Sequence, residues 1–178
     1  MSIATKMAAF IEKYGAAAQA AAAGSPVFAQ TILSAAALES GYGKSSLAAR
    51  YNNFFGIKAD KSWTGKTVTF PTKEQTKAGK VYTVNAAFRH YDTAEASFRN
   101  YVKFIQGPRY VKAGVTKAQS PQEQFEKIHA AGYATDVAYS NKLKNIFNSV
   151  KSWAVKNPVK AAGSGLATAL VFFCSLST

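Results

Sequence analysis

Apolar side chains recur at helical spacing over most of the chain, and the pattern changes only in its middle. Residues 3–14 place apolar side chains on one stripe, which predicts a packed first helix, and the alanine-rich run 16–23 predicts a second, short one. The Ser-Pro pair at 25–26 is typical of a helix start, and the helix it predicts ends at the Ser-Gly-Tyr-Gly sequence of residues 40–43. We therefore expect Glu39 in the last turn of that helix.

The middle of the chain favours β-structure. Residues 67–70 and 81–84 are rich in β-branched and aromatic side chains, which predicts a hairpin, and residues 87–91 are predicted to add a third short strand. Polar caps followed by apolar stripes predict three further helices, which begin after Asp92, Ser120 and Asp136. Together these elements predict an α+β domain that is predominantly helical.

The C-terminal segment differs from the rest of the chain. Pro158 marks the predicted boundary between a domain of residues 1–157 and a tail of residues 158–178, and residues 161–178 carry no charge. Eighteen helical residues span about 27 Å, slightly less than the ~30 Å hydrocarbon core of a bilayer. Two interpretations stay open: an apolar tail packed on the domain or left disordered, and a membrane anchor preceded by the basic residues Lys151, Lys156 and Lys160.

The net charge and the scarce metal ligands narrow the classes of function. A formal charge of +13 favours an anionic partner such as nucleic acid, a lipid surface or an acidic wall polymer. The lysines are spread along the chain without a nucleic-acid-binding motif, so we expect no nucleic acid partner. One cysteine and two distant histidines predict neither a disulfide framework nor a zinc site, and we expect no metal or cofactor. Charges at Lys6 and Glu12 also argue against a signal peptide.

Several short segments, in one order, match the motifs of a known family. They are Leu-Glu-Ser-Gly-Tyr-Gly-Lys-Ser at 38–45, Asn-Asn-Phe-Phe-Gly-Ile-Lys at 52–58, Phe-Arg-His-Tyr at 88–91, Arg-Tyr at 109–110, Gly-Tyr-Ala-Thr-Asp at 132–136 and Tyr-Ser-Asn-Lys-Leu at 139–143. Over roughly residues 3–150 the chain closely resembles the glucosaminidase domain of bacterial and phage peptidoglycan hydrolases, a family that includes autolysins and flagellar rod-assembly enzymes. One departure is the Ser-Ala-Ala-Ala run at 34–37, where relatives are commonly more polar.

The resemblance implies a lysozyme-like fold and cleavage of the β-1,4 bond after N-acetylglucosamine in the wall glycan. Such cleavage needs a carboxylic acid that still holds its proton near neutral pH. Glu39 matches the general acid of the family. Its predicted place at a helix C-terminus, which carries partial negative charge, would raise the pKa of the carboxyl group.

The family also implies a second carboxylate, contributed by the hairpin. Glu74 is the only acid between residues 67 and 84, and Asp60 in the preceding loop is the alternative. The carboxyl separation would distinguish an inverting from a retaining reaction, and the acetamido group of the substrate is a further candidate nucleophile. Tyr133 matches a family tyrosine that lines the cleft, where its hydroxyl binds sugar or positions water.

Four more residues are candidates for substrate binding. Tyr42 stands where the family usually has an aromatic side chain, Asn52 and Asn53 are expected to bind acetamido groups, and Trp63 is expected either to stack on a sugar or to cover the core. The predicted partner is the peptidoglycan glycan strand. The alternative function is a wall-binding or structural module that keeps the fold without turnover.

The tail, if it is a membrane anchor, bears on the location of the protein. Lysines before an anchor favour the cytoplasmic side for the catalytic domain, away from the wall. An enzyme stored on a virion membrane, or freed at lysis, would tolerate that arrangement. We therefore predict a virus-encoded or virion-associated lysin that acts at the bacterial cell wall and carries a C-terminal membrane tether at residues 161–178.

Overall fold

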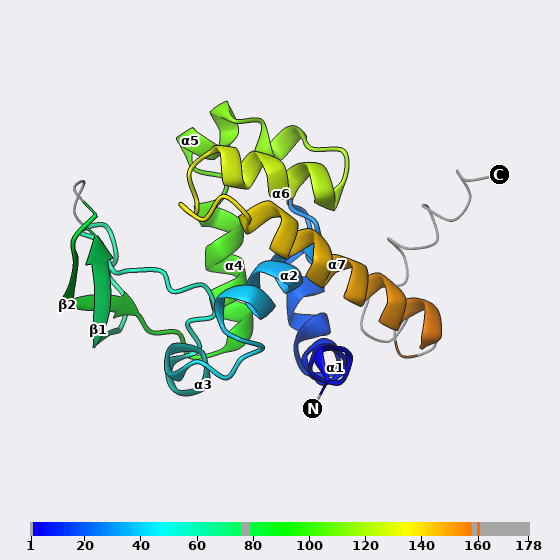
Figure 1. Ribbon diagram of the computed structural model, residues 1–178, viewed down its shortest axis with the longest axis horizontal. Coiled ribbons are helices and arrows are strands. Elements are labelled where there is room, and N and C mark those ends of the chain that lie inside the picture. Colours follow the sequence, from blue (N-terminus) through cyan, green and yellow to red (C-terminus); the bar gives the residue numbers. More distant parts are fainter. Residues whose placement is uncertain (1, 76–78, 158–159, 161–178) are drawn as a thin grey trace.

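A helical body and a projecting β-hairpin make up the protein in the computed structural model, which describes residues 2–75, 79–157 and 160 (Figure 1). The predicted α+β, predominantly helical fold is confirmed. The elements, in chain order, are α1 (Ile3–Ala22), α2 (Ala29–Glu39), α3 (Ser46–Tyr51), β1 (Thr67–Gln75), β2 (Val81–Arg89), α4 (Ala94–Phe104), α5 (Pro108–Lys112), the 3-10 helix η1 (Val115–Lys117), α6 (Pro121–Ala130) and α7 (Tyr139–Lys156).

Helix α2 forms the centre of the body. All of its residues from Ala29 to Ala37 are buried, and α1, α4, α6 and α7 all contact it. The side chains of residues 35–37 are alanines with no exposed surface, so neighbouring helices approach the backbone closely. Because α2 is surrounded in this way, the position of its last residue, Glu39, is set by the packing of the whole body.

The predicted inward faces of the later helices are confirmed, whereas their caps are confirmed only in part. Ser120 Oγ accepts the Glu123 amide at 3.2 Å, as the capping pattern predicts. The cap of α4 is Thr93 instead of Asp92, because the Thr93 hydroxyl accepts the Ala96 amide. Asp136 does not cap α7, because it accepts the Ala138 amide in the preceding turn and the helix begins only at Tyr139. The buried side chains on these faces are Phe98, Tyr101, Val102, Ile105, Phe125, Ile128, Tyr139, Leu143, Ile146, Phe147 and Val150.

Two predictions about the N-terminal helices are wrong. The alanine-rich run continues α1 as one helix to Ala22, since Gly15 alone does not break it. The Ser-Pro pair at 25–26 forms a turn, in which Ser25 Oγ donates to the Ala22 carbonyl, and α2 begins only at Ala29. The start of α2 is capped from another helix, because the buried Gln124 of α6 accepts the Phe28 amide through Oε1.

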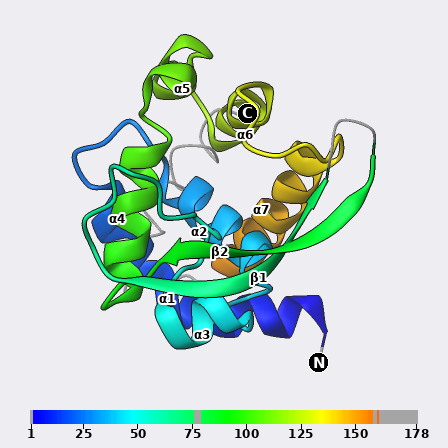
Figure 2. The ribbon, with the colours of Figure 1, turned by 90° about the vertical axis from the view of Figure 1, so that its left-hand side faces the viewer.

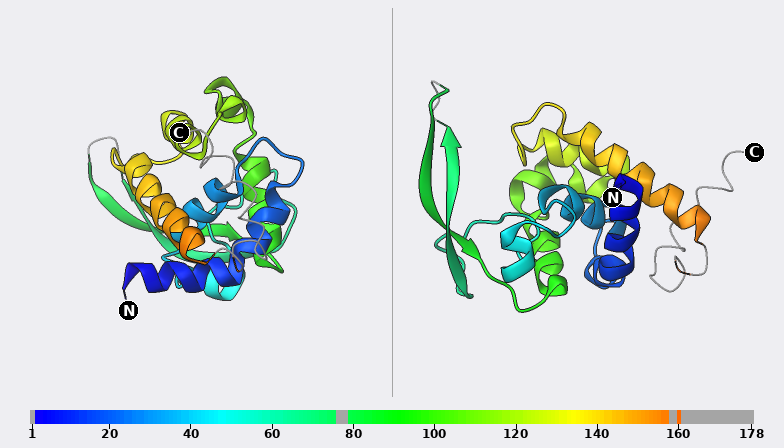
Figure 3. Two further views of the ribbon diagram at one scale, coloured as in Figure 1. Left: turned by 90° about the vertical axis from the view of Figure 1, so that its right-hand side faces the viewer. Right: turned by 60° about the horizontal axis from the view of Figure 1, so that its bottom comes forward.

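The hairpin is longer than its sequence pattern predicts. Strands β1 and β2 pair antiparallel from Thr67↔Arg89 to Gln75↔Val81, so residues 87–89 end β2 instead of forming a third strand. Lys58 bridges to Phe88 beside them. Figure 2 shows the hairpin curving across the front of the helical body, and Figure 3 shows the two strands projecting away from the helices.

The predicted tail lies almost wholly outside the described residues. Of residues 158–178 only Lys160 is described, where its ammonium group pairs with Glu12 of α1 at 2.8 Å. No helix in the described ranges is both long and apolar enough to cross a membrane.

Candidate active site

Glu39 is the last residue of α2, as predicted, and a tight turn follows it directly. Ser40 Oγ donates to the Ala36 carbonyl at 2.5 Å and accepts the Gly43 amide at 2.7 Å. The three residues 41–43 all have positive φ, at 56°, 61° and 77°. Glycine tolerates this conformation readily, while at Tyr42 it is unusual for a side chain of that size. The turn stops the helix sharply and leaves Glu39 at the rim of the packed body.

A cleft of about 400 Å³ opens at the Glu39 side chain. The loop that follows α3 contributes one wall, α4 and α5 a second, and the loop before α7 a third. The lining residues are Glu39, Phe55, Gly56, Ile57, Lys58, Asp60, Phe104, Arg109, Tyr133 and Ala134. Glu39 therefore reaches solvent through a cleft, and the general-acid prediction requires such a cleft.

The protein around Glu39 favours its protonated form. Glu39 is exposed to the cleft, yet the protein atoms around its carboxyl group displace enough water to raise the pKa of that group above its ordinary value. The Tyr139 hydroxyl interacts with the carboxylate and lowers the pKa, but it offsets the effect of burial only in part. The group therefore holds its proton to a higher pH than a solvated glutamate does.

Three tyrosines gather around Glu39 from separate elements. The Tyr133 ring lies 5.8 Å from that of Tyr101 and 5.7 Å from that of Tyr139, measured between centroids. Burial raises the pKa of all three phenols, and the charge of Glu39 adds to the effect in each. Among the described residues, the buried hydroxyls of Tyr101 and Tyr139 have no hydrogen-bond partner of ordinary geometry. The surroundings of the acid therefore include three neutral phenols.

The sequence identified Tyr101 and Tyr139 only as members of apolar stripes. Their place beside Glu39 depends on how α4 and α7 pack against the end of α2. The sequence does hold one clue, because a tyrosine brings a hydroxyl group into a core that a phenylalanine could fill equally well.

Asp60 is the second carboxylate of the cleft among the side chains that the structure describes. Its Oδ1 accepts both the amide and the hydroxyl of Ser62, at 2.9 and 2.5 Å, and its Oδ2 pairs with Arg89 at 3.2 Å. The Ser62 hydrogen bonds, followed by the Arg89 charge, lower the pKa of Asp60. An acid that is readily protonated and an acid that is readily ionised thus line the same cleft.

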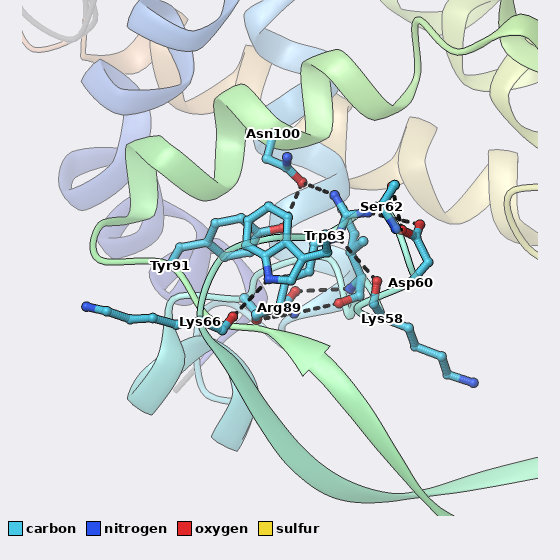
Figure 4. Close-up of polar contacts among 10 residues, drawn as sticks. Lys58, Asp60, Ser62, Trp63, Lys66, Arg89, Tyr91 and Asn100 are labelled. Carbon is cyan, nitrogen blue, oxygen red and sulfur yellow. Dashed lines mark hydrogen bonds and ion pairs between the residues drawn. The ribbon is translucent and has the colours of Figure 1, made fainter.

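Arg89 ties the Asp60 loop to the body. Its nearly buried guanidinium group donates to the Lys58 carbonyl, to Asn100 Oδ1 and to Asp60 Oδ2. The Tyr91 hydroxyl donates to the same Asn100 oxygen at 2.8 Å, as Figure 4 shows. The network fixes the loop that forms one wall of the cleft.

Glu74, the predicted second acid, lies far along the hairpin from its base. It is the eighth of the nine residues of β1 and pairs with Tyr82. Its side chain lies outside what the structure describes, so its relation to Glu39 stays a prediction.

The predicted substrate-binding residues do not all meet in the cleft. Tyr133 lines it, whereas Tyr42 packs edge-on against Phe10, with centroids 6.3 Å apart. Asn52 ends α3 in the left-handed conformation and donates to the Tyr91 carbonyl. Trp63 lies in a neighbouring hollow.

The expectation that Asn53 binds an acetamido group is corrected by its environment. Asn53 is 1% exposed, its Nδ2 donates to the carbonyls of Ile57 and Arg89, and its Oδ1 accepts the Ile57 amide. These bonds use both amide hydrogens and leave no accessible group for a sugar. Asn53 holds the cleft loop instead.

Metal ligands do not gather in the described part of the chain. It contains no cluster of three or more His, Cys, Asp or Glu side chains that could hold a metal ion.

Comparisons with known proteins agree with the motifs. Residues 15–152 match the glucosaminidase family, described as "Mannosyl-glycoprotein endo-beta-N-acetylglucosaminidase". Peptidoglycan hydrolase FlgJ of Pseudomonas aeruginosa is 35% identical over 151 residues, which cover 83% of this chain and 37% of FlgJ. Exo-glucosaminidase LytG of Bacillus subtilis is 36% identical over 124 residues, which cover 67% of this chain and 43% of LytG. The chain thus spans less than half the length of either relative.

A solved structure shows the same fold. The catalytic domain of the autolysin Auto from Listeria monocytogenes superposes with a TM-score of 0.72 at 28% identity, covering 84% of this chain and 86% of that domain. The family match covers most of the chain and includes both Glu39 and the residues that line its cleft. The chain therefore belongs to the glucosaminidase family of glycoside hydrolases.

Proposed function

We propose that this protein hydrolyses the β-1,4 bond after N-acetylglucosamine in peptidoglycan, within the strand, with Glu39 as the general acid. The observation that carries the proposal is a carboxyl group of raised pKa that lines a cleft at the end of a buried helix. The relatives support the substrate and the sugar, since FlgJ is named a peptidoglycan hydrolase and LytG an exo-glucosaminidase.

In the proposed reaction, Glu39 gives its proton to the bridging oxygen as the glycosidic bond breaks. A carboxylate must then stabilise the positive charge that develops on the sugar or activate the attacking water. We assign this role to Glu74 of the hairpin, with Asp60 as the alternative. Tyr133 lines the cleft with Glu39, and its hydroxyl would bind the sugar or position water. Acid, carboxylate and water suffice, so the proposal includes no metal or cofactor.

Tyr42, Asn52 and Trp63 are retained as proposed substrate contacts. Tyr42 follows Glu39 by three residues and is half-buried, and Asn52 keeps partial exposure beside α3. Trp63 is half-buried and lines a hollow that shares Asp60 and Phe104 with the cleft.

The test of the acid compares two Glu→Gln variants on purified peptidoglycan. Glu39→Gln should reduce the rate about 10²–10⁴-fold, the range typical of a positioned general acid. Glu95→Gln, which changes an exposed acid on α4 that pairs with Arg99, should cleave like the wild type. Borohydride reduction of the products identifies the new reducing end. Glucosaminitol supports the proposed bond, whereas muramitol or an active Glu39→Gln variant contradicts the proposal.

The second carboxylate is tested by comparing Glu74→Gln with Asp60→Asn. Loss of turnover in Glu74→Gln with folded protein supports Glu74. Loss confined to Asp60→Asn would transfer the role to Asp60. Chain length distinguishes endo from exo cleavage, because internal cleavage releases long fragments before disaccharides accumulate.

We further propose that residues 158–178 tether a virus-encoded lysin to a membrane. The support is the uncharged run 161–178 directly after three lysines. In flotation with zwitterionic vesicles, which do not attract the basic body electrostatically, the full chain should rise with the lipid, whereas a chain ending at Pro158 should not. Equal flotation of both would contradict the tether.

A further inference from the structure

A second hollow of about 400 Å³ adjoins the catalytic cleft, and we name it the side pocket. Trp63, Arg89, Asn100 and Lys103 are among the residues that line it, and it shares Asp60 and Phe104 with the cleft. Any ligand that fills the cleft therefore lies directly beside this pocket. The proposed general acid, Glu39, does not line it.

The aromatic wall of the side pocket is held in place. The Arg89 guanidinium lies 4.7 Å from the centre of the Trp63 ring, and Trp63 Nε1 donates to the Lys66 carbonyl at 3.0 Å (Figure 4). A Cβ atom at Gly65 would stand only 2.4 Å from the same ring, so only glycine fits beneath it. The wall is therefore preorganised for binding.

Two cations border the ridge between the two hollows. Lys103 is exposed in the side pocket, while Arg109 lines the cleft with its guanidinium 5.9 Å from the centre of the Phe104 ring. Among the side chains that the structure describes, no carboxylate pairs with either cation. Asp60 and Arg89, by contrast, already neutralise each other. The ridge thus combines an apolar ring with positive charge.

This combination matches the branch of a peptidoglycan strand. Alternate sugars of the strand carry a lactyl group and a peptide whose small apolar residue is followed by carboxylates. Resting on the proposed function, we propose that the side pocket binds this acidic stem peptide, with Lys103 and Arg109 pairing with its carboxylates and Phe104 contacting its apolar part. The enzyme then favours glycan that still carries its peptides.

The test uses glycan strands from unamidated diaminopimelate-type peptidoglycan, either intact or stripped of peptide by an amidase. The wild type should show a lower KM on the intact strands. The ratio of kcat/KM values, intact over stripped, should fall about fivefold in Lys103→Gln, which corresponds to about 1 kcal/mol for an exposed ion pair. High salt should also lower this kcat/KM ratio in the wild type, because it screens the ion pairs.

The matched control is Lys112→Gln, which removes an exposed lysine at the end of α5 outside the lining of both hollows. Its ratio should equal that of the wild type. An unchanged ratio in Lys103→Gln, or an equal fall in Lys112→Gln, would overturn the inference while leaving the proposed hydrolysis intact. Failure of the wild type to cleave either substrate would instead overturn the proposed function.

Discussion

Gln124 is expected to determine the stability of the helix that carries Glu39. Its fully buried amide group accepts the Phe28 amide at 3.1 Å and donates to the carbonyls of Pro26 and Val115 at 3.0 and 3.1 Å. Gln124→Met keeps the length of the side chain but removes all three bonds. The start of α2 then loses its cap, because Phe28 has no side-chain oxygen of its own nearby to replace it.

The magnitude follows from the burial of each bond. The Val115 bond is buried, while the Phe28 and Pro26 bonds are partly buried and regain some hydration when broken. At about 1–3 kcal/mol for a buried unsatisfied group, and about 0.5–1.5 kcal/mol for each of the other two, the loss is about 4 kcal/mol. For a chain of this size, that loss lowers Tm by about 8–16 °C.

Thermal unfolding followed by far-UV circular dichroism measures the effect. The control is Gln122→Met on the same helix, where the side chain is only half-buried. Equal Tm values for the two variants would refute the reasoning that α6 caps α2.

Three further predictions concern the cleft. Tyr139→Phe removes the hydroxyl that lowers the pKa of Glu39, so the alkaline limb of the pH–rate profile should move to higher pH. Tyr101→Phe is the control. A shift to lower pH in Tyr139→Phe would contradict the effect of this hydroxyl on Glu39. Because burial raises the folded-state pKa of Glu39, the folded chain binds more protons than the unfolded chain between the unfolded-state and folded-state pKa values of this group. The folded state therefore loses stability as pH rises through that range. Urea unfolding should therefore find Glu39→Gln more stable than the wild type at pH 7, and a less stable variant would contradict this. A lysine in place of Arg89 cannot make all three contacts to Lys58, Asn100 and Asp60, so urea unfolding of Arg89→Lys should show a free energy of unfolding lower by about 2 kcal/mol. Arg99→Lys, on the exposed face of α4, should lose little. Equal losses in the two variants would contradict the role of the network.

Local pattern was sufficient to predict the helical faces and the position of Glu39. Apolar periodicity identifies which side of α4, α6 and α7 points inward, and the glycine-rich run after Glu39 marks the end of α2. Both patterns extend over only a few residues, so they do not depend on contacts between distant segments of the chain. The exact starts of α2 and α4 were missed because a contact from α6 and the choice between adjacent polar residues decide them.

The composition of the cleft depends on contacts between distant segments, which a single sequence does not reveal. The sequence around Asn53 predicts a surface amide, but in the folded protein the Asn53 side chain donates a hydrogen bond to the Arg89 carbonyl, 36 residues away. The ionised state of Asp60 depends on Ser62 and Arg89, and the environment of Glu39 depends on tyrosines from α4 and α7. Residue types alone identify candidates, and the packing decides which of them meet.

The most direct test is an NMR titration of the Glu39 carboxyl carbon in the free protein, assigned by its loss in Glu39→Gln. We predict that Glu39 titrates at a higher pH than a solvated glutamate, because the protein around it raises the pKa of its carboxyl group. Titration of Glu39 at or below the pH at which a glutamate titrates in an unfolded peptide would contradict its role as the proton donor.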